Sequence, residues 1–375
     1  MPRRGENIYK RKDGRWEGRF IKDRDLGGKA VYGYVYAKTY SEVKRALNIA
    51  SRKIESQTES VIIRMSVQEV LTSWLEHKKL HVKESTFARY YQIVHVYLIP
   101  QLGLLDISTI SVCTVEKLVH QLLSSGKKNG NGGLSTKSVN DILCVIKACV
   151  NYAKDNNYPV NCNLQHLHVK QGNSNMRILS VEEQKRLSAI LLSDIDLVKL
   201  GIMLSLYTGI RIGELCALKW EDINLDSGIM VIKHTLQRIK NTSSEPASKT
   251  KVITSEPKSR SSIREIPLPH DILELLQNNK GNEKAYVLTG EKNHYIEPRT
   301  IQNRFKSLLK EGGLPNVNYH VLRHTFATRC VEAGFELKSL SEILGHSSVN
   351  ITLNRYVHSS IRLKQENMGK VKIYT

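Results

Sequence analysis

Three helix-start signatures set the frame in which this chain can fold. Each is a Ser or Thr followed three residues later by Glu, a pattern in which the two side chains satisfy backbone N–H groups that the first helical turn leaves unpaired. The signatures are Thr39 with Glu42, Ser66 with Glu69, and Ser180 with Glu183. The second and third open long stretches of helical periodicity. The chain is therefore expected to be multidomain and mainly α, because 375 residues exceed one ordinary domain.

The stretch after Ser66 predicts an all-helical bundle over residues 64–160. Apolar side chains at Val70, Leu71, Trp74 and Leu75 recur at helical spacing. Further helices are expected over 84–97, 112–124 and 135–155. A Lys, Asn and Gly-rich loop separates the last two, and a polar linker over 161–176 ends the bundle.

The first 60 residues predict a small three-stranded sheet backed by one helix. Two short runs flank Asp13-Gly14, a strong hairpin signal, and a third run covers 30–37. A helix from Thr39 to about residue 53 follows. The alternative is a merely solvated basic face, but a basic, aromatic strand surface suits contact with DNA phosphates and a groove. The residues expected on that surface are Arg15, Trp16, Arg19, Tyr32, Tyr34 and Tyr36.

The charge of the chain favours a polyanionic partner. Lys and Arg number 56 against 36 Asp and Glu, a formal charge of +20, and such a field attracts nucleic acid. A membrane span is not expected, because no segment approaches the ~20 consecutive apolar residues that one requires. The basic start does not resemble a signal peptide, so we expect a cytoplasmic protein.

Neither a disulfide nor a metal site is expected. The six cysteines have no CxxC spacing, and several lie on the apolar side of helical patterns. The one cluster to consider, Cys162 with His166 and His168, matches no zinc spacing.

The third segment, 177–375, predicts a mixed α+β domain that carries the chemistry. It is mostly helical, with short apolar runs suited to strands at 228–233 and 263–267. In Thr208-Gly-Ile-Arg-Ile-Gly-Glu-Leu, Gly209 is expected to end a helix, and Arg211 and Glu214 lie one turn apart at the next. Arg211 would grip a phosphate, and Glu214 would hold Arg211 in place.

A second block places two more polar side chains on one face. His320 and Arg323 are three residues apart on an expected helix, and an arginine fork meets two phosphate oxygens at once. Downstream, Leu344-Gly-His346 is followed ten residues later by Tyr356. A helix–turn–helix could bring His346 and Tyr356 together. Such a set supplies a nucleophile and cations for breaking a phosphodiester without hydrolysis.

These blocks resemble the tyrosine recombinase family, also called the lambda or phage integrase family. The blocks that match are T-G-I-R-I-G-E-L, H-V-L-R-H-T-F-A-T, L-G-H and N-R-Y. The resemblance implies an active site of Arg211, His320, Arg323, His346 and Tyr356. It also implies a Lys on a β-hairpin as the acid for the leaving 5′-hydroxyl. Residues 257–267 match that hairpin, which favours Lys258, with Lys249 and Lys251 as nearby alternatives.

The basic sheet followed by a helical bundle is similar to integrases of conjugative transposons from Gram-positive bacteria. The resemblance implies an arm-type DNA-binding domain over 1–60, a helical core-binding domain over 64–160 and a catalytic domain over 177–375. It implies double-stranded DNA as partner, a homo-tetrameric synapse, accessory excision or DNA-bending factors, and work at the bacterial nucleoid. Strand cutting through a 3′-phosphotyrosyl link at Tyr356 needs neither ATP, metal nor another cofactor.

Two rival functions remain open from the sequence. A type IB topoisomerase uses the same Tyr, Arg, His and Lys chemistry but relaxes DNA without strand exchange. A DNA-binding regulator that has lost catalysis is the other class, although the complete residue set disfavours it. An assay that scores covalent adduct, relaxation and exchange separates all three.

Overall fold

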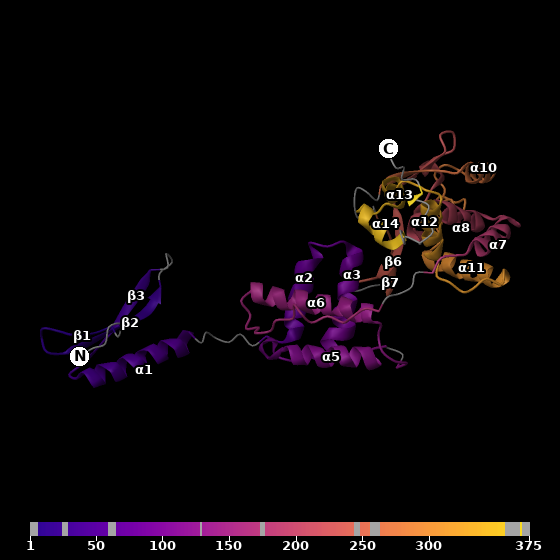
Figure 1. The fold of residues 1–375 in the computed structure, drawn as a ribbon. Helices are drawn as coiled ribbons and strands as arrows, with labels where there is room; N and C mark the ends of the chain where they lie inside the picture. The colour runs from indigo at the N-terminus through magenta and orange to yellow at the C-terminus, as the bar shows by residue number, and fades with distance from the viewer. Residues whose placement is uncertain are drawn as a thin grey trace. The chain divides into compact units, whose positions relative to one another are not determined.

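The computed structural model divides the chain into two compact units. The first comprises residues 1–81 with 93–170, and the second residues 82–92 with 171–375. Figure 1 shows the helices and strands of both units. The residues that the structure describes are 7–24, 29–58, 65–127, 130–172, 177–243, 248–255, 263–356 and 368–369.

The expected N-terminal sheet is present. Strands β1 (Ile8–Lys10), β2 (Trp16–Arg24) and β3 (Ala30–Ala37) pair antiparallel in that order. Helix α1 (Tyr40–Thr58) follows the expected Thr39 cap, in which Thr39 Oγ1 accepts from the Glu42 N–H at 3.3 Å. The helix runs five residues further than predicted and lies along one face of the sheet (Figure 1).

The other face of this sheet carries a row of exposed aromatic and basic side chains. The register pairs Glu17 with Tyr36, Arg19 with Tyr34 and Ile21 with Tyr32, and paired residues share a face. We call Arg19, Tyr32, Tyr34 and Tyr36 the tyrosine face. Its three tyrosines are between 39% and 50% exposed, and the Arg19 guanidinium lies 4.3 Å from the Tyr32 ring centroid.

Trp16 does not belong to the tyrosine face, which corrects the expectation from sequence. It pairs with Ala37 on the opposite side of the sheet, and its ring meets the Tyr40 ring of α1 edge-on at 5.2 Å. The indole therefore packs between sheet and helix. Arg15 does reach the tyrosine face, with its guanidinium 5.8 Å from the Tyr36 ring centroid.

The expected helical bundle forms, and its first helix begins at the predicted cap. Ser66 donates its N–H to Glu69 at 2.7 Å and accepts the Glu69 N–H at 3.2 Å. Trp74 is 1% exposed within the apolar core. The predicted helix over 84–97 ends earlier, at Ile93, and continues as a π-helical turn. The elements over this stretch are α2 (Val67–Lys79), α3 (Glu84–Ile93), η1 (Val94–Leu98), α4 (Ile99–Leu102), η2 (Ile107–Thr109), α5 (Val112–Ser125) and α6 (Thr136–Asp155). Of these, α3 belongs to the second unit, up to residue 92.

The second unit is built around one almost wholly buried helix, α8. Its residues Leu200, Ile202 and Leu204 have no exposed surface, as expected of a helix that is apolar all round. The Ser180–Glu183 box starts the first helix of this part of the chain, as predicted. The helices are α7 (Val181–Leu192), α8 (Leu197–Thr208), α9 (Ile212–Ala217), η3 (Trp220–Asp222), α10 (His270–Asn278), α11 (Pro298–Glu311), α12 (Val321–Glu332), α13 (Leu337–Leu344) and α14 (Val349–Tyr356).

Two small sheets accompany these helices. Strands β4 (Ile223–Asn224), β5 (Ile229–Ile232) and β8 (Arg264–Pro267) form one antiparallel sheet in that order. Strands β6 (Thr235–Lys240) and β7 (Thr250–Ser255) form the hairpin. Most of the predicted hairpin over 257–267 lies outside the described residues, and its described end, β8, pairs with the distant β5. Lys258 itself lies outside the described residues.

No helix among the described residues is long and apolar enough to cross a membrane. The described residues hold no cluster of His, Cys, Asp and Glu that could bind a metal ion. All six cysteines are free thiols.

Candidate active site

The site begins where α8 ends, at the predicted glycine. Gly209 caps α8 in the left-handed conformation, with φ of 67°, and Arg211 then adopts an extended conformation at the start of α9. A Cβ at residue 209 would lie 2.5 Å from the Phe326 ring, so the turn requires glycine. Arg211 is thus placed at a helix start, one turn from Glu214.

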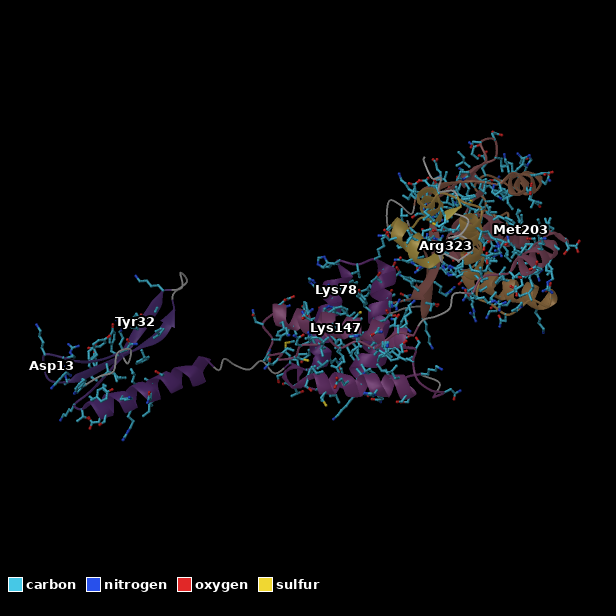
Figure 2. All side chains as sticks on the ribbon, viewed as in Figure 1. Asp13, Tyr32, Lys78, Lys147, Met203 and Arg323 are labelled. Carbon is cyan, nitrogen blue, oxygen red and sulfur yellow. The ribbon has the colours of Figure 1, made fainter. Side chains whose placement is uncertain are left out.

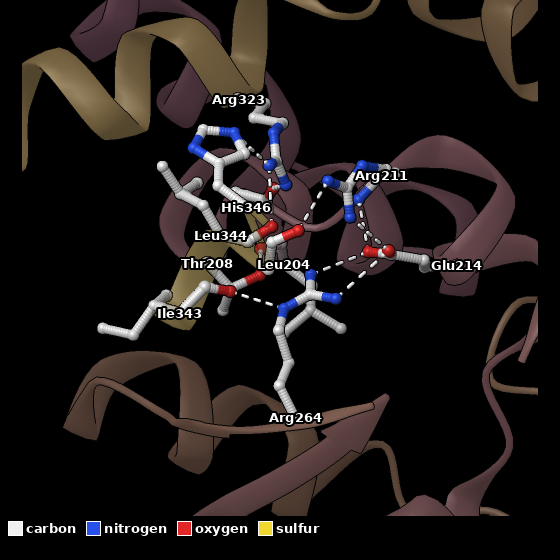
Figure 3. A network of polar contacts seen from close by, with 11 residues as sticks. Leu204, Thr208, Arg211, Glu214, Arg264, Arg323, Ile343, Leu344 and His346 are labelled. Carbon is white, nitrogen blue, oxygen red and sulfur yellow. Dashed lines mark hydrogen bonds and ion pairs between the residues drawn. The ribbon is translucent and has the colours of Figure 1, made fainter. Parts of the chain in front are cut away.

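Glu214 is the centre of a buried network of two arginines (Figure 3). It accepts from Arg211 Nη1 at 2.8 Å and from the Arg211 N–H at 2.9 Å. Arg264, from β8, donates Nη1 and Nη2 to its two carboxylate oxygens at 3.1 and 2.8 Å. Burial opposes ionisation of the carboxyl group, but the hydrogen bonds and charges of Arg264 and Arg211 outweigh it and lower the pKa of Glu214 to about 2. Glu214 is therefore a fixed negative charge that orients Arg211.

Arg323 is held by the C-terminal ends of two helices. It lies inside the second unit, as does Met203 of α8 (Figure 2), and is only 3% exposed. Its Nη1 donates to the Gly209 carbonyl at 2.8 Å, and its Nη2 to the Leu344 carbonyl at 2.7 Å. Such terminal carbonyls lack helical partners and carry the negative end of the helix dipole. Burial and the neighbouring Arg211 lower the pKa of Arg323 to about 9, which leaves it cationic at neutral pH.

The Leu344-Gly-His346 block adds carbonyl and imidazole groups to this cluster. Gly345 ends α13 with φ of 64°, and its carbonyl accepts from Arg211 Nη2 at 3.0 Å. His346 Nε2 lies 2.9 Å from Arg323 Nη2, and because Arg323 can only donate, Nε2 accepts. The ring proton is then on Nδ1, which donates to Thr352 Oγ1 at 2.8 Å. Both nitrogens of His346 are therefore engaged.

Tyr356, the last residue of α14, lies against this cluster. It is 4% exposed, and its ring is stacked parallel to the His346 ring with 6.3 Å between centroids. Its hydroxyl is 3.0 Å from His324 Nδ1. Burial raises the pKa of Tyr356, and the charges of Arg323 and Arg355 oppose that rise. The phenol is thus neutral at pH 7 and must lose its proton to act as a nucleophile.

The half-buried histidines beside this tyrosine are neutral at physiological pH. Burial, with the charges of Arg355 and Arg323, lowers the pKa of His324 to about 4. Burial, with Arg323 and Arg211, lowers the pKa of His346 to about 3. As a neutral imidazole, His324 can accept a proton at pH 7, whereas both nitrogens of His346 are already engaged.

Most of the sequence-predicted residues meet at this one place. Arg211, Glu214, Arg323, His346 and Tyr356 form the connected cluster described above. His320 caps the start of α12, exposed, with its ring edge-on to His324 at 4.5 Å between centroids. Lys258 lies outside the described residues.

The sequence reading missed three residues of the cluster. Arg264, His324 and Thr352 were not singled out, although each stands inside or beside a motif already quoted. His324 follows His320 by four residues, which places both on one helix face. Thr352 lies between His346 and Tyr356. For Arg264 the contact spans fifty residues of sequence, so no local pattern indicates it.

The fold and the family matches define a site-specific tyrosine recombinase. Residues 177–362 match the phage integrase family, and residues 66–123 match the N-terminal SAM-like domain of phage integrases. The chain therefore belongs to the phage integrase family of tyrosine recombinases.

Particular relatives agree with this assignment. A XerC-like tyrosine recombinase of Caldanaerobacter subterraneus is 26% identical over 360 residues, covering 89% of this chain and 90% of the relative. The integrase of transposon Tn1549, solved with a circular intermediate DNA, is 22% identical with a TM-score of 0.65, covering 82% of this chain and 100% of the other. The lambda integrase tetramer bound to a Holliday junction is 16% identical with a TM-score of 0.58, covering 95% of this chain and 98% of the other. At these identities the two solved structures show a shared fold.

Proposed function

We propose that this chain cuts and rejoins DNA strands at specific sites through a 3′-phosphotyrosyl link at Tyr356, and so integrates and excises a mobile genetic element. The observation that carries the proposal is the contact of one buried phenol with a cluster of guanidinium and imidazole groups. A nucleophile beside cations aimed at one point is the arrangement that phosphoryl transfer requires.

The roles follow from the chemistry of each group. Arg211 and Arg323 hold the nonbridging oxygens of the scissile phosphate and, with His320 and His346, stabilise the charge of the pentavalent transition state. Tyr356 attacks phosphorus in line with the 5′-oxygen, which leaves. Lys258 gives that oxygen its proton. The phosphotyrosyl bond keeps the energy of the phosphodiester, so the partner strand's 5′-hydroxyl can reverse the step without ATP or metal.

The three parts of the chain divide the work on DNA. Residues 64–160 and 177–375 both bind the core site, and residues 1–60 bind arm-type sites through the tyrosine face. The net charge of +20 suits all three contacts.

The DNA partner and the assembly are inferred from relatives. The similar Tn1549 integrase was solved with circular intermediate DNA, and the similar lambda integrase as a tetramer on a Holliday junction. We infer that this chain likewise works as a homo-tetramer on paired DNA ends, with accessory excision or DNA-bending factors. Its place of action would be the cytoplasm, at the nucleoid.

A suicide substrate tests the proposal. DNA crosslinked to the protein is recovered and sequenced, and nicked duplexes are built from the shared core sequence. The wild-type chain should form a covalent adduct and exchange strands, and Tyr356→Phe should form none. Tyr207→Phe is the matched control, because the Tyr207 hydroxyl contacts Ser188 Oγ at 3.0 Å. An adduct with Tyr356→Phe would refute the assignment, and relaxation without exchange would indicate a topoisomerase.

A further inference from the structure

We propose that His324 is a further catalytic residue, whose Nδ1 takes the phenolic proton of Tyr356 during attack and returns it during rejoining. The inference rests on the proposed recombinase function and deepens it. It names the proton acceptor that this function leaves open.

Geometry selects His324 among the histidines of the site. Its Nδ1 is 3.0 Å from the Tyr356 hydroxyl oxygen, within the range for direct proton transfer. The His346 ring also lies near the Tyr356 ring, 6.3 Å between centroids, but its Nε2 accepts from Arg323 and its Nδ1 donates to Thr352. In this arrangement His346 has no lone pair for the phenol.

The packing of two helices fixes the positions of His324 and Tyr356. His324 lies on α12 one turn after His320, and Tyr356 ends α14, which packs against α12. The His324 and Tyr356 rings are 5.7 Å apart between centroids and tilted by 49°. A side chain on a packed helix is more firmly placed than one on a loop, so the acceptor is in position before DNA binds.

The charges around His324 couple its basicity to the bound DNA. The charged and titratable groups that face it are His320 and Arg323 on α12, and Arg355 and Tyr356 on α14, with His346 beyond the phenol ring. Two of these are cations that disfavour an imidazolium. A phosphodiester between the arginines would offset their charge and make His324 a stronger base at the moment of attack.

The proton and bond balance is complete for both directions. In cutting, the bond from phosphorus to the Tyr356 oxygen forms and the bond to the 5′-oxygen breaks. The phenolic proton moves to His324 Nδ1, and the leaving oxygen takes a proton from the separate acid, proposed as Lys258. In rejoining, the 5′-hydroxyl attacks and loses its proton to that residue, and Tyr356 leaves with the proton from His324.

Adduct formation by the full-length protein on the nicked core duplex tests the proposal. His324→Ala should slow adduct formation by about 100-fold or more, the range typical for loss of a general base. Its rate should rise with pH as more phenolate forms, and added imidazole should restore part of it. His324→Asn can still hydrogen-bond the phenol but cannot take a proton, so it should be as slow as His324→Ala.

The controls separate catalysis from folding and from the parent proposal. His294→Ala changes an exposed histidine and should behave as wild type. Circular dichroism and core-DNA binding check that the His324 variants fold. A wild-type rate in His324→Ala or in His324→Asn would overturn the proposal, as would a slow His324→Ala that neither pH nor imidazole improves. Absence of any Tyr356 adduct in the wild-type protein would instead overturn the proposed function.

Discussion

Arg264 and Glu214 form a two-pronged ion pair in the interior, with both side chains at most 5% exposed. Glu214 uses the same two oxygens to hold Arg211. Arg264 therefore helps to orient Arg211 through the carboxylate of Glu214. Its Nε also donates to the Ile343 carbonyl near the end of α13, at 2.5 Å, so one side chain ties β8, α9 and α13 together.

We expect Arg264→Ala to lower both stability and activity. Removing one partner of a buried ion pair costs roughly 3 kcal/mol, because the other charge stays buried. The adduct rate at saturating DNA should fall, because Arg211 loses its orientation. The affinity for core DNA should change little. Arg264→Lys, which cannot make two parallel bonds, should recover only part of the loss.

Arg304→Ala is the matched control, because it removes one positive charge from an arginine that is 40% exposed. Thermal unfolding and adduct kinetics measure both variants. Equal behaviour of Arg264→Ala and Arg304→Ala would show that the buried pair does not position the site.

The site should resist protonation down to unusually low pH. The pKa of His324 is lowered to about 4 and that of His346 to about 3, from an ordinary value near 6.5. The unfolded chain therefore binds more protons than the folded chain between these values. The two neutral histidines therefore contribute fully to the free energy of unfolding above pH 6.5, and this contribution is lost as the pH falls toward 4. Imidazole nitrogen shifts in an NMR titration check this directly.

Phosphate analogues give this pH prediction a second test. Orthovanadate or a short core duplex bound between the arginines should raise both histidine pKa values, because an anion favours imidazolium. A titration midpoint near 6.5 in the free protein would contradict the lowered values.

Lys258→Ala should slow cutting of an ordinary substrate while sparing a 5′-phosphorothiolate one. A thiolate leaving group needs no acid, so the defect of the variant should disappear with that substrate. Lys249→Ala and Lys251→Ala are the comparisons, because these residues are the neighbouring candidates. A rescue confined to one of them would move the acid to that lysine.

Deleting residues 1–60 should abolish binding to arm-type DNA and leave core cleavage in place. Within that segment, replacing Tyr32, Tyr34 and Tyr36 by alanine should have the same effect, since stacking and cation–π contacts lie on the tyrosine face. Ile49→Ala, 60% exposed on α1, is the control. Gel shifts on arm and core duplexes measure both. Equal loss of arm and core binding would refute a separate module.

Local signals carried most of the fold prediction. Nearby residues determine the capping boxes at Ser66 and Ser180 and the turn at Gly209. The sequence therefore predicts all three. The strand pairing of β8 with β5 is not, because it joins residues more than thirty positions apart. The apolar run over 263–267 thus predicts a strand but not its partner.

The site shows the same division between local and distant information. His320 and Arg323 are one turn apart, so their shared face follows from helix geometry. Arg264 reaches Glu214 only through the folded chain. The error at Trp16 differs, because two-residue alternation along a strand already separates it from Arg19.

The two left-handed glycines, Gly209 and Gly345, fix the spacing of the guanidinium groups. Each ends a helix so that a terminal carbonyl points at an arginine. One residue of helix turns the chain by about 100°, so inserting a single alanine into α8 or α13 would swing that carbonyl away from its partner. The positions of the guanidinium groups thus depend on the lengths of α8 and α13. We therefore expect the chain to tolerate substitutions along these helices far better than insertions or deletions.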